Sequence, residues 1–190
     1  MVRRDKFIDP ERINEIIAVL EKFSKEQHFH FALVGGVAIQ YLGSDRLTKD
    51  VDVVADTPMD PEGKFTALGP IDFGGTAYQT ASGGKLDFII RNDDFQKLYE
   101  KALEEAIITE DGFPMVTPDY LAAMKFIAHI TDHSSTRRVI HLSDLKWLLS
   151  QPGLVDPKKV EALIYRYAGG RLPQESFKRV VDEVRFEQQS

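Results

Sequence analysis

The sequence of 190 residues contains no cysteine and no long apolar run. Without cysteine, disulfide scaffolds and thiolate metal sites are excluded. The longest apolar segments, 29–37 and 86–90, are far shorter than the ~20 residues that a membrane-spanning helix needs. The start, residues 1–5, is not followed by the apolar core of a signal peptide. We therefore expect a cytoplasmic protein with no membrane contact.

An excess of positive charge is also missing, because 24 basic side chains face 30 acidic ones and the net charge is -6. This balance argues against a surface built as a whole for the nucleic-acid backbone, although it leaves room for a local basic strip. A chain of this length buries roughly 70% of the surface that its unfolded form exposes. One sizeable core, or one domain with a modest appendage, is expected.

Helix and strand signals alternate in the first part of the chain. Residues 10–23 carry apolar side chains at helical spacing, and Asp9 is a candidate cap for this helix. Short apolar runs at 29–34, 51–55 and 85–90 are typical of strands, and the glycines and prolines of 57–84 favour loops and short hairpin strands between them. The pattern predicts an α/β (α+β) domain over residues 1–116.

Only helical patterns follow Thr117 and Pro118, which predict a helix start. We therefore expect a helical C-terminal segment over residues 117–190.

Three features in the first domain need a chemical reason. Gly35 and Gly36 end an apolar strand, and such a turn lets backbone amides approach a phosphate closely, although glycine pairs in turns are common. Asp50 and Asp52 alternate with valines, so both carboxylates point to one face of a strand. Either a divalent cation neutralises this pair, or the pair is simply solvated on an edge strand.

The third feature is Asp87, which lies in the apolar run 86–90. If this strand pairs beside residues 51–55, Asp87 completes a three-carboxylate cluster of the kind that holds two Mg²⁺ ions for displacement at phosphorus. The alternative is a buried salt bridge from Asp87 to Lys85 or Arg91.

Together these residues resemble one family. A glycine pair after an apolar strand, thirteen further residues, Asp50-Val51-Asp52-Val53 and a later aspartate inside an apolar strand are similar to the DNA polymerase β-type nucleotidyltransferase superfamily. The fuller pattern, residues 35–38 followed by 46–52, looks most like small bacterial nucleotidyltransferase-like proteins related to the AbiEii toxins. The resemblance implies a nucleotidyltransferase fold with a mixed, twisted sheet and a helical C-terminal segment.

The resemblance also implies an activity, namely Mg²⁺-dependent transfer of a nucleoside monophosphate from a nucleoside triphosphate to a hydroxyl acceptor, with Mn²⁺ as a substitute metal. It assigns Asp50 and Asp52 to the metal ions, and Asp87 to the metal and to deprotonation of the acceptor hydroxyl. Gly35 and Gly36 would hold the triphosphate.

Basic residues complete the implied nucleotide site. Arg46 matches a basic residue that precedes the metal aspartates in the small relatives and would neutralise phosphate charge, unless it is an exposed loop arginine. Lys125 matches the lysine of a helical leucine-to-lysine motif that is thought to reach the nucleotide, although an exposed helix lysine is the commoner case. Residues 141–145 resemble a further segment of the AbiEii group, in which a histidine or lysine is followed by aspartates before a final helix. The alternative for Asp144 is that it caps this helix or pairs with Lys146 or Arg138.

The chain departs from the family pattern beside the glycine pair. Val34 and Val37 stand where a lysine or a hydroxyl residue is usual, so a phosphate-facing hydroxyl is missing. Aminoglycoside-modifying relatives usually carry a tryptophan near the glycine pair and a histidine before the two aspartates, and this chain has neither at those positions, which disfavours an antibiotic-resistance role.

Two alternatives to the enzyme follow. One is a non-catalytic nucleotide-binding or partner-binding module with the same fold. The other is a toxin component controlled by an antitoxin protein. The acceptor of the implied reaction stays open between RNA, protein and a small molecule.

Overall fold

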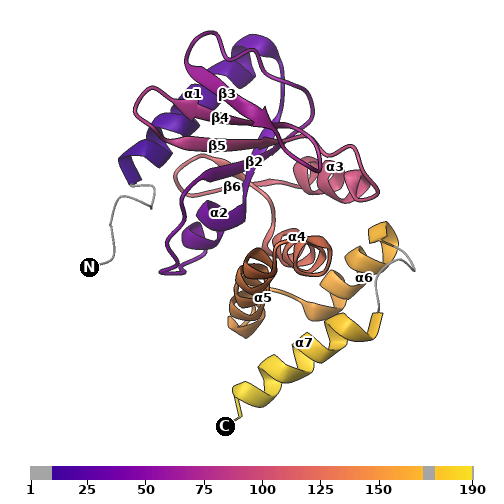
Figure 1. Cartoon of the computed structure of the whole chain (residues 1–190). Helices are drawn as coiled ribbons and strands as arrows, with labels where there is room; N and C mark the ends of the chain where they lie inside the picture. Colours follow the sequence, from indigo (N-terminus) through magenta and orange to yellow (C-terminus); the bar gives the residue numbers. More distant parts are fainter. Residues whose placement is uncertain (1–9, 169–173, 190) are drawn as a thin grey trace. The chain divides into compact units, whose positions relative to one another are not determined.

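The computed structural model describes residues 10–168 and 174–189 (Figure 1). The chain divides into two compact units, Met1–Val116 and Thr117–Ser190, which are described separately below. The described residues form seven strands, all in the first unit, and seven helices, four of them in the second. The predicted mixed α/β fold with a helical C-terminal segment is thereby confirmed. The predicted cap Asp9 lies outside the described residues.

The first unit is built on one mixed sheet. Its strands are β1 (Phe31–Val34), β2 (Val51–Ala55), β3 (Phe65–Pro70), β4 (Thr76–Thr80), β5 (Lys85–Ile89), β6 (Ile107–Ile108) and β7 (Pro114–Met115). They lie in the order β3-β4-β5-β2-β1-β7-β6. The pairs β2–β5 and β1–β7 are parallel, and the other four neighbouring pairs are antiparallel. Strand β2 therefore lies inside the sheet, with β1 on one side and β5 on the other.

Helix α1 (Pro10–Gln27) lies against one face of this sheet (Figure 1). The five apolar residues that recur at helical spacing are all buried: Ile13, Ile16, Ile17, Leu20 and Phe23. Phe23 meets Phe65 of β3 edge to face, with ring centroids 6.3 Å apart. Burial of each such side chain stabilises the fold by roughly 1.5–3 kcal/mol, so the apolar stripe fixes the helix on the sheet.

Two shorter helices complete the first unit. Helix α2 (Gly35–Tyr41) follows β1 without a loop, so the glycine pair forms the first turn of the helix. Helix α3 (Gln96–Glu104) follows β5 and buries Leu98 and Tyr99. The hairpin of β6 and β7 was not predicted from the sequence, because strands of two residues are too short to show a period.

The second unit consists of α4 (Pro118–Thr131), α5 (Ser135–Ser150), α6 (Pro157–Ala168) and α7 (Gln174–Glu187). Helix α4 is its centre, because every residue from Tyr120 to Ile127 is buried. Phe126 meets Phe177 of α7 edge to face, with ring centroids 5.2 Å apart. None of the helices in the described part of the chain combines the length and apolar character needed to cross a bilayer.

Candidate active site

Two aspartates face each other across neighbouring parallel strands. Asp52 of β2 and Asp87 of β5 are direct register partners, as are the apolar residues that flank them. Direct partners project to the same face of a sheet, so the two carboxylates share one face. Asp50 lies two residues before Asp52, in the bend that precedes β2, so strand alternation does not fix the direction of its side chain. The predicted pairing of the third strand beside residues 51–55 is confirmed, and the edge-strand alternative is wrong, since β2 has a neighbour on each side.

The glycine turn lies directly against this acidic face. Register pairs Asp52 with Val34, the residue before Gly35. Gly35 has a φ of +66°, and a Cβ atom at this position would lie only 1.8 Å from Asp52 Oδ2. The backbone N–H of Gly36 donates to the same oxygen at 3.4 Å. Only glycine leaves room for the carboxylate here, so the turn and the aspartate are built as one feature.

The loop between α2 and β2 brings two more polar side chains to the turn. A Cβ atom at Gly36 would lie 2.5 Å from Thr48 Oγ1 and 3.1 Å from Arg46 Nη1. Thr48 is buried, and its hydroxyl donates to the backbone oxygen of Asp50 at 3.2 Å. The guanidinium of Arg46 therefore lies beside the glycine turn, and Arg46 is not a fully exposed loop arginine.

The two salt bridges considered for Asp87 are not formed. Arg91 instead binds Asp93, with its Nε atom 2.8 Å from Asp93 Oδ1. Lys85 takes part in no ion pair with any residue that the structure describes. Asp87 is thus not a mere structural counter-ion of either basic residue.

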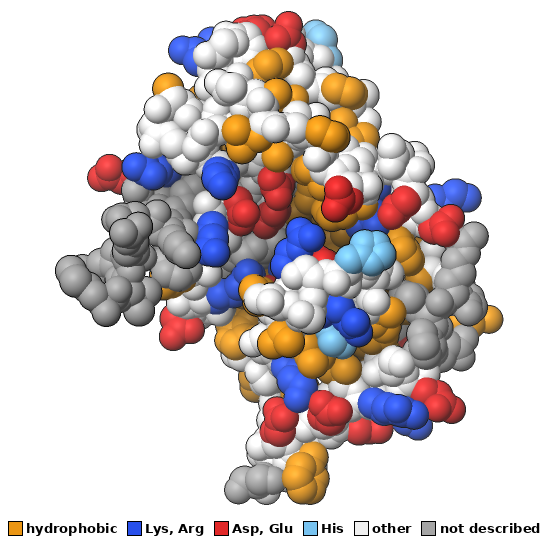
Figure 2. All heavy atoms as spheres, viewed as in Figure 1, with side chains coloured by type: hydrophobic (Ala, Val, Ile, Leu, Met, Phe, Trp, Pro, Cys, Tyr) orange, Lys and Arg blue, Asp and Glu red, His pale blue; other side chains and the backbone are white. Residues whose placement is uncertain are grey.

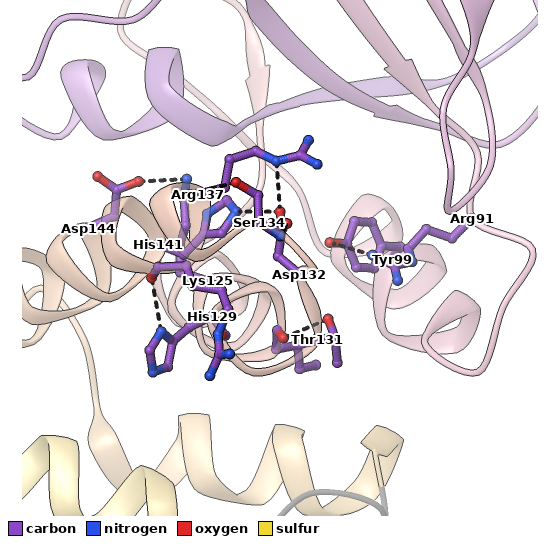
Figure 3. A network of polar contacts seen from close by, with 12 residues as sticks. Arg91, Tyr99, Lys125, His129, Thr131, Asp132, Ser134, Arg137, His141 and Asp144 are labelled. Carbon is purple, nitrogen blue, oxygen red and sulfur yellow. Dashed lines mark hydrogen bonds and ion pairs between the residues drawn. The ribbon is translucent and has the colours of Figure 1, made fainter.

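Arg91 is the centre of a buried aromatic cluster next to the site. Its guanidinium lies 4.6 to 5.3 Å from the ring centroids of Phe73, Phe95 and Tyr99, and it donates to the Tyr99 hydroxyl at 3.2 Å (Figure 3). Burial raises the pKa of Tyr99 against the opposing effect of Arg91, and the negative charge of Asp52 acts in the same direction as burial. The sequence did not single out this cluster, because its members lie on three separate segments.

The carboxylates of this face were also predicted as metal ligands. Within residues 10–168 and 174–189, no group of three or more His, Asp or Glu side chains is gathered closely enough to hold a metal ion by itself. The face offers Asp52 and Asp87 as a register pair, with Asp50 two residues away along the chain.

Lys125 belongs to the second unit and differs from the exposed lysine expected at this kind of position. Its side chain is 8% exposed, and its ammonium lies 2.7 Å from Oδ2 of Asp144, which is 3% exposed (Figure 3). Asp144 lies in the middle of α5 and pairs with Lys125 of α4, so it does not cap a helix. The alternative pairing of Asp144 with Lys146 or Arg138 is not formed either. Lys146 pairs instead with Glu183 and Glu187 on α7.

A histidine extends this pair into a network that the sequence did not predict. His141 Nε2 lies 3.5 Å from Asp132 Oδ2, and Arg137 Nε lies 3.2 Å from the same oxygen (Figure 3). The buried Nδ1 atom of His141 has no hydrogen-bond partner within the described part of the chain. Burial, with the nearby Lys125 ammonium, lowers the pKa of His141 from 6.5 to about 4. His141 is therefore neutral at physiological pH.

The surface carries charges of both signs. On the face drawn in Figure 2, Asp and Glu side chains alternate with Lys and Arg side chains. This mixture agrees with the small net charge of the sequence, -6. This face therefore shows no broad field of one sign.

Comparison with known proteins shows which fold the chain has. No family model matches the chain, and no curated protein matches it in sequence. In structure, the chain is similar to an antigenic nucleotidyltransferase-like protein from Paracoccidioides brasiliensis, with 13% identity, a TM-score of 0.52 and coverage of 93% of this chain and 94% of that chain.

Two further structures support the same assignment. ANT(2″)-Ia in complex with adenylyl-2″-tobramycin matches with 15% identity, a TM-score of 0.52 and coverage of 83% of this chain and 99% of that chain. JHP933 from Helicobacter pylori matches with 13% identity, a TM-score of 0.51 and coverage of 94% and 92%. The chain therefore has the nucleotidyltransferase fold, as its motifs predicted. Similarity at these identities shows the fold alone.

Proposed function

We propose that the protein is a nucleotidyltransferase that moves a nucleoside monophosphate from a nucleoside triphosphate to a hydroxyl group of an acceptor. The observation that carries this proposal is the register pairing of Asp52 with Asp87 on one sheet face, directly against the turn at Gly35. The structure of ANT(2″)-Ia holds adenylyl-2″-tobramycin, which is a product of the same chemical kind.

The donor chemistry of this face fits Mg²⁺. The carboxylates of Asp52, Asp87 and Asp50 are hard oxygen ligands, and Mg²⁺ is usually held by one or two carboxylates together with substrate phosphates and water. Two register-paired carboxylates therefore suffice, and a protein cage of three or more ligands is not required. The metal would supply neutralisation of phosphate charge, and Mn²⁺ has the same ligand preference.

The remaining roles fall to the chain's own groups. The backbone at Gly35 and Gly36 leaves space for close approach of the triphosphate, and the Arg46 guanidinium beside the turn is suited to its negative charge. The acceptor oxygen forms a bond to the α-phosphorus while the bond from this phosphorus to pyrophosphate breaks. Pyrophosphate leaves with the electron pair, and the carboxylate of Asp87 takes the hydroxyl proton. The predicted nucleotide contact of Lys125 stays a prediction.

A transfer assay tests the proposal. The protein is incubated with Mg²⁺, each labelled nucleoside triphosphate in turn and cell extract as the source of acceptor. We expect pyrophosphate release and one labelled species, and a loss of about 100-fold or more in Asp52→Asn and Asp87→Asn. Asp72→Asn, a change at an exposed aspartate of the β3–β4 loop, is the matched control. An absence of product, or equal product in wild type and Asp52→Asn, would contradict the proposal.

One observation favours a binding module that has lost turnover. Val34 and Val37, which flank the glycine pair, are 4% and 1% exposed, so neither position offers a hydroxyl to a phosphate. Calorimetry with MgATP separates the two functions. Binding without pyrophosphate release in the wild type supports the module, whereas binding with release supports the enzyme.

The relation to the AbiEii toxins rests on the sequence motifs alone. Growth arrest on expression, relieved by Asp52→Ala, would support a toxin that needs an antitoxin partner. Normal growth on expression of the folded wild-type protein would count against it.

A further inference from the structure

A row of hydrogen-bond donors crosses the sheet beside the two aspartates. Thr66 of β3 is the register partner of Gln79 of β4, and Gln79 is in turn the partner of Lys85 of β5. Direct partners project to the same face, so the three side chains form one line across three strands. Lys85 is two residues before Asp87 on β5, so this line, here called the donor row, lies on the face that carries Asp87 and Asp52.

The donor row is open to solvent, in contrast to the other face of the same strands. Thr66 and Lys85 are exposed and Gln79 is half-buried. Their neighbours along the strands, such as Tyr78 and Leu86, point to the opposite face and are buried, at 7% and 0% exposure. Helix α1 covers that opposite face through contacts such as Phe23 with Phe65. The face with the donor row is therefore a platform on which a ligand can lie.

The chemistry of the donor row selects a negative charge. Lys85 carries an ammonium group that takes part in no ion pair with the described residues, although Asp87 lies two residues further along β5. Gln79 adds an amide whose Nε2 atom, among the residues that the structure describes, makes a single long hydrogen bond of 3.4 Å to the backbone oxygen of Gly83. Thr66 adds a hydroxyl. Ammonium, amide and hydroxyl groups together are donors suited to a phosphate or a carboxylate.

We propose that the donor row Thr66, Gln79 and Lys85 binds an anionic group of the acceptor and so places the acceptor's hydroxyl beside Asp87. This inference rests on the proposed function and adds the chemical class of the acceptor. Two residues along a strand span about 6.6 Å, so the hydroxyl and the anionic group of the acceptor are separated by about the width of one sugar ring. Lys85 also disfavours a cationic acceptor at this face by like-charge repulsion.

A different role for Lys85 makes a different prediction. If Lys85 served only to offset the charge of Asp87 and Asp52, its removal would alter metal binding and leave the affinity for small anions unchanged. The proposal requires the reverse pattern.

Nuclear magnetic resonance titration of the full chain without metal tests the inference with ribose 5-phosphate as the probe and ribose as its uncharged match. We expect ribose 5-phosphate, and not ribose, to shift the side-chain amide resonances of Gln79 and the backbone amide of Lys85. Lys85→Glu should weaken this binding at least tenfold. Lys97→Glu, a change of the same kind at an exposed lysine of α3, should leave it unchanged.

Equal binding of ribose 5-phosphate in wild type and Lys85→Glu, or shifts confined to Gly35 and Gly36, would overturn the inference. Because this titration needs no nucleotide and no turnover, its outcome is independent of the transfer assay. Binding at the donor row in a protein that releases no pyrophosphate would contradict only the proposed reaction.

Discussion

The close approach of Asp52 to the glycine turn gives a quantitative prediction. In Gly35→Ala, the new Cβ atom would lie 1.8 Å from Asp52 Oδ2, 2.5 Å from its Cγ and 2.7 Å from its Cβ. The third of these atoms is attached directly to the backbone of β2, so rotation of the side chain cannot remove the overlap. Either the turn or the strand must move.

The cost has two parts that a control variant separates. A left-handed φ of +66° at an alanine costs about 1 kcal/mol, and overpacking against Asp52 adds about 1–3 kcal/mol. Gly63 has a φ of +72°, and a Cβ atom added there would meet nothing within 4 Å, so Gly63→Ala carries the backbone cost alone. We therefore expect Gly35→Ala to lose about 2–4 kcal/mol of unfolding free energy and Gly63→Ala about 1 kcal/mol.

Urea denaturation of wild type and both variants, followed by circular dichroism, measures these differences. The same samples report on function, because displacement of Asp52 should also lower pyrophosphate release in Gly35→Ala and leave it unchanged in Gly63→Ala. Equal stability of the two variants would refute the packing of Asp52 against the turn.

Two further predictions concern the second unit. Lys125→Met removes the ammonium that pairs with the buried Asp144 carboxylate and should cost about 3–5 kcal/mol of unfolding free energy. The double variant Lys125→Met, Asp144→Leu should recover most of this loss in urea denaturation, and a single variant as stable as wild type would refute the buried pair. The pKa of His141 is lowered from 6.5 to about 4, so the unfolded chain binds more protons than the folded one between these values. The contribution of neutral His141 to the unfolding free energy is therefore complete above pH 6.5. As the pH falls below 6.5, the unfolding free energy decreases by up to about 3 kcal/mol. The difference in unfolding free energy between wild type and His141→Gln should therefore change between pH 7 and 4.5, and a difference that stays constant over this range would contradict the prediction.

The sequence predicted that Asp52 and Asp87 lie on neighbouring strands, because short apolar runs mark both strands and an aspartate inside the apolar run 86–90 demands a special environment. The alternation of valine with Asp50 and Asp52 did not predict that the strand begins only at Val51, which leaves Asp50 in the preceding bend. The contact of Gly35 with Asp52 could not be predicted in the same way, since it depends on the register of β1 against β2.

The helical unit shows the limit of the same reasoning. From the sequence, Lys125 was either a lysine that reaches the nucleotide, as the resemblance implies, or an exposed helix lysine. In the structure α4 is buried on every side from Tyr120 to Ile127, so Lys125 is buried too and needs the partner that Asp144 provides. Whether a helix is buried on every side depends on the elements that pack around it, and the sequence of the helix alone does not reveal them.

Binding of Mn²⁺ in the presence of a non-hydrolysable nucleoside triphosphate tests the central claim most directly. Calorimetry and electron paramagnetic resonance of the folded protein should show Mn²⁺ binding that is weakened at least tenfold in both Asp52→Asn and Asp87→Asn and is retained in Asp72→Asn. Mn²⁺ binding of equal affinity in the wild type and in Asp87→Asn would show that the two register-paired aspartates do not form one metal site.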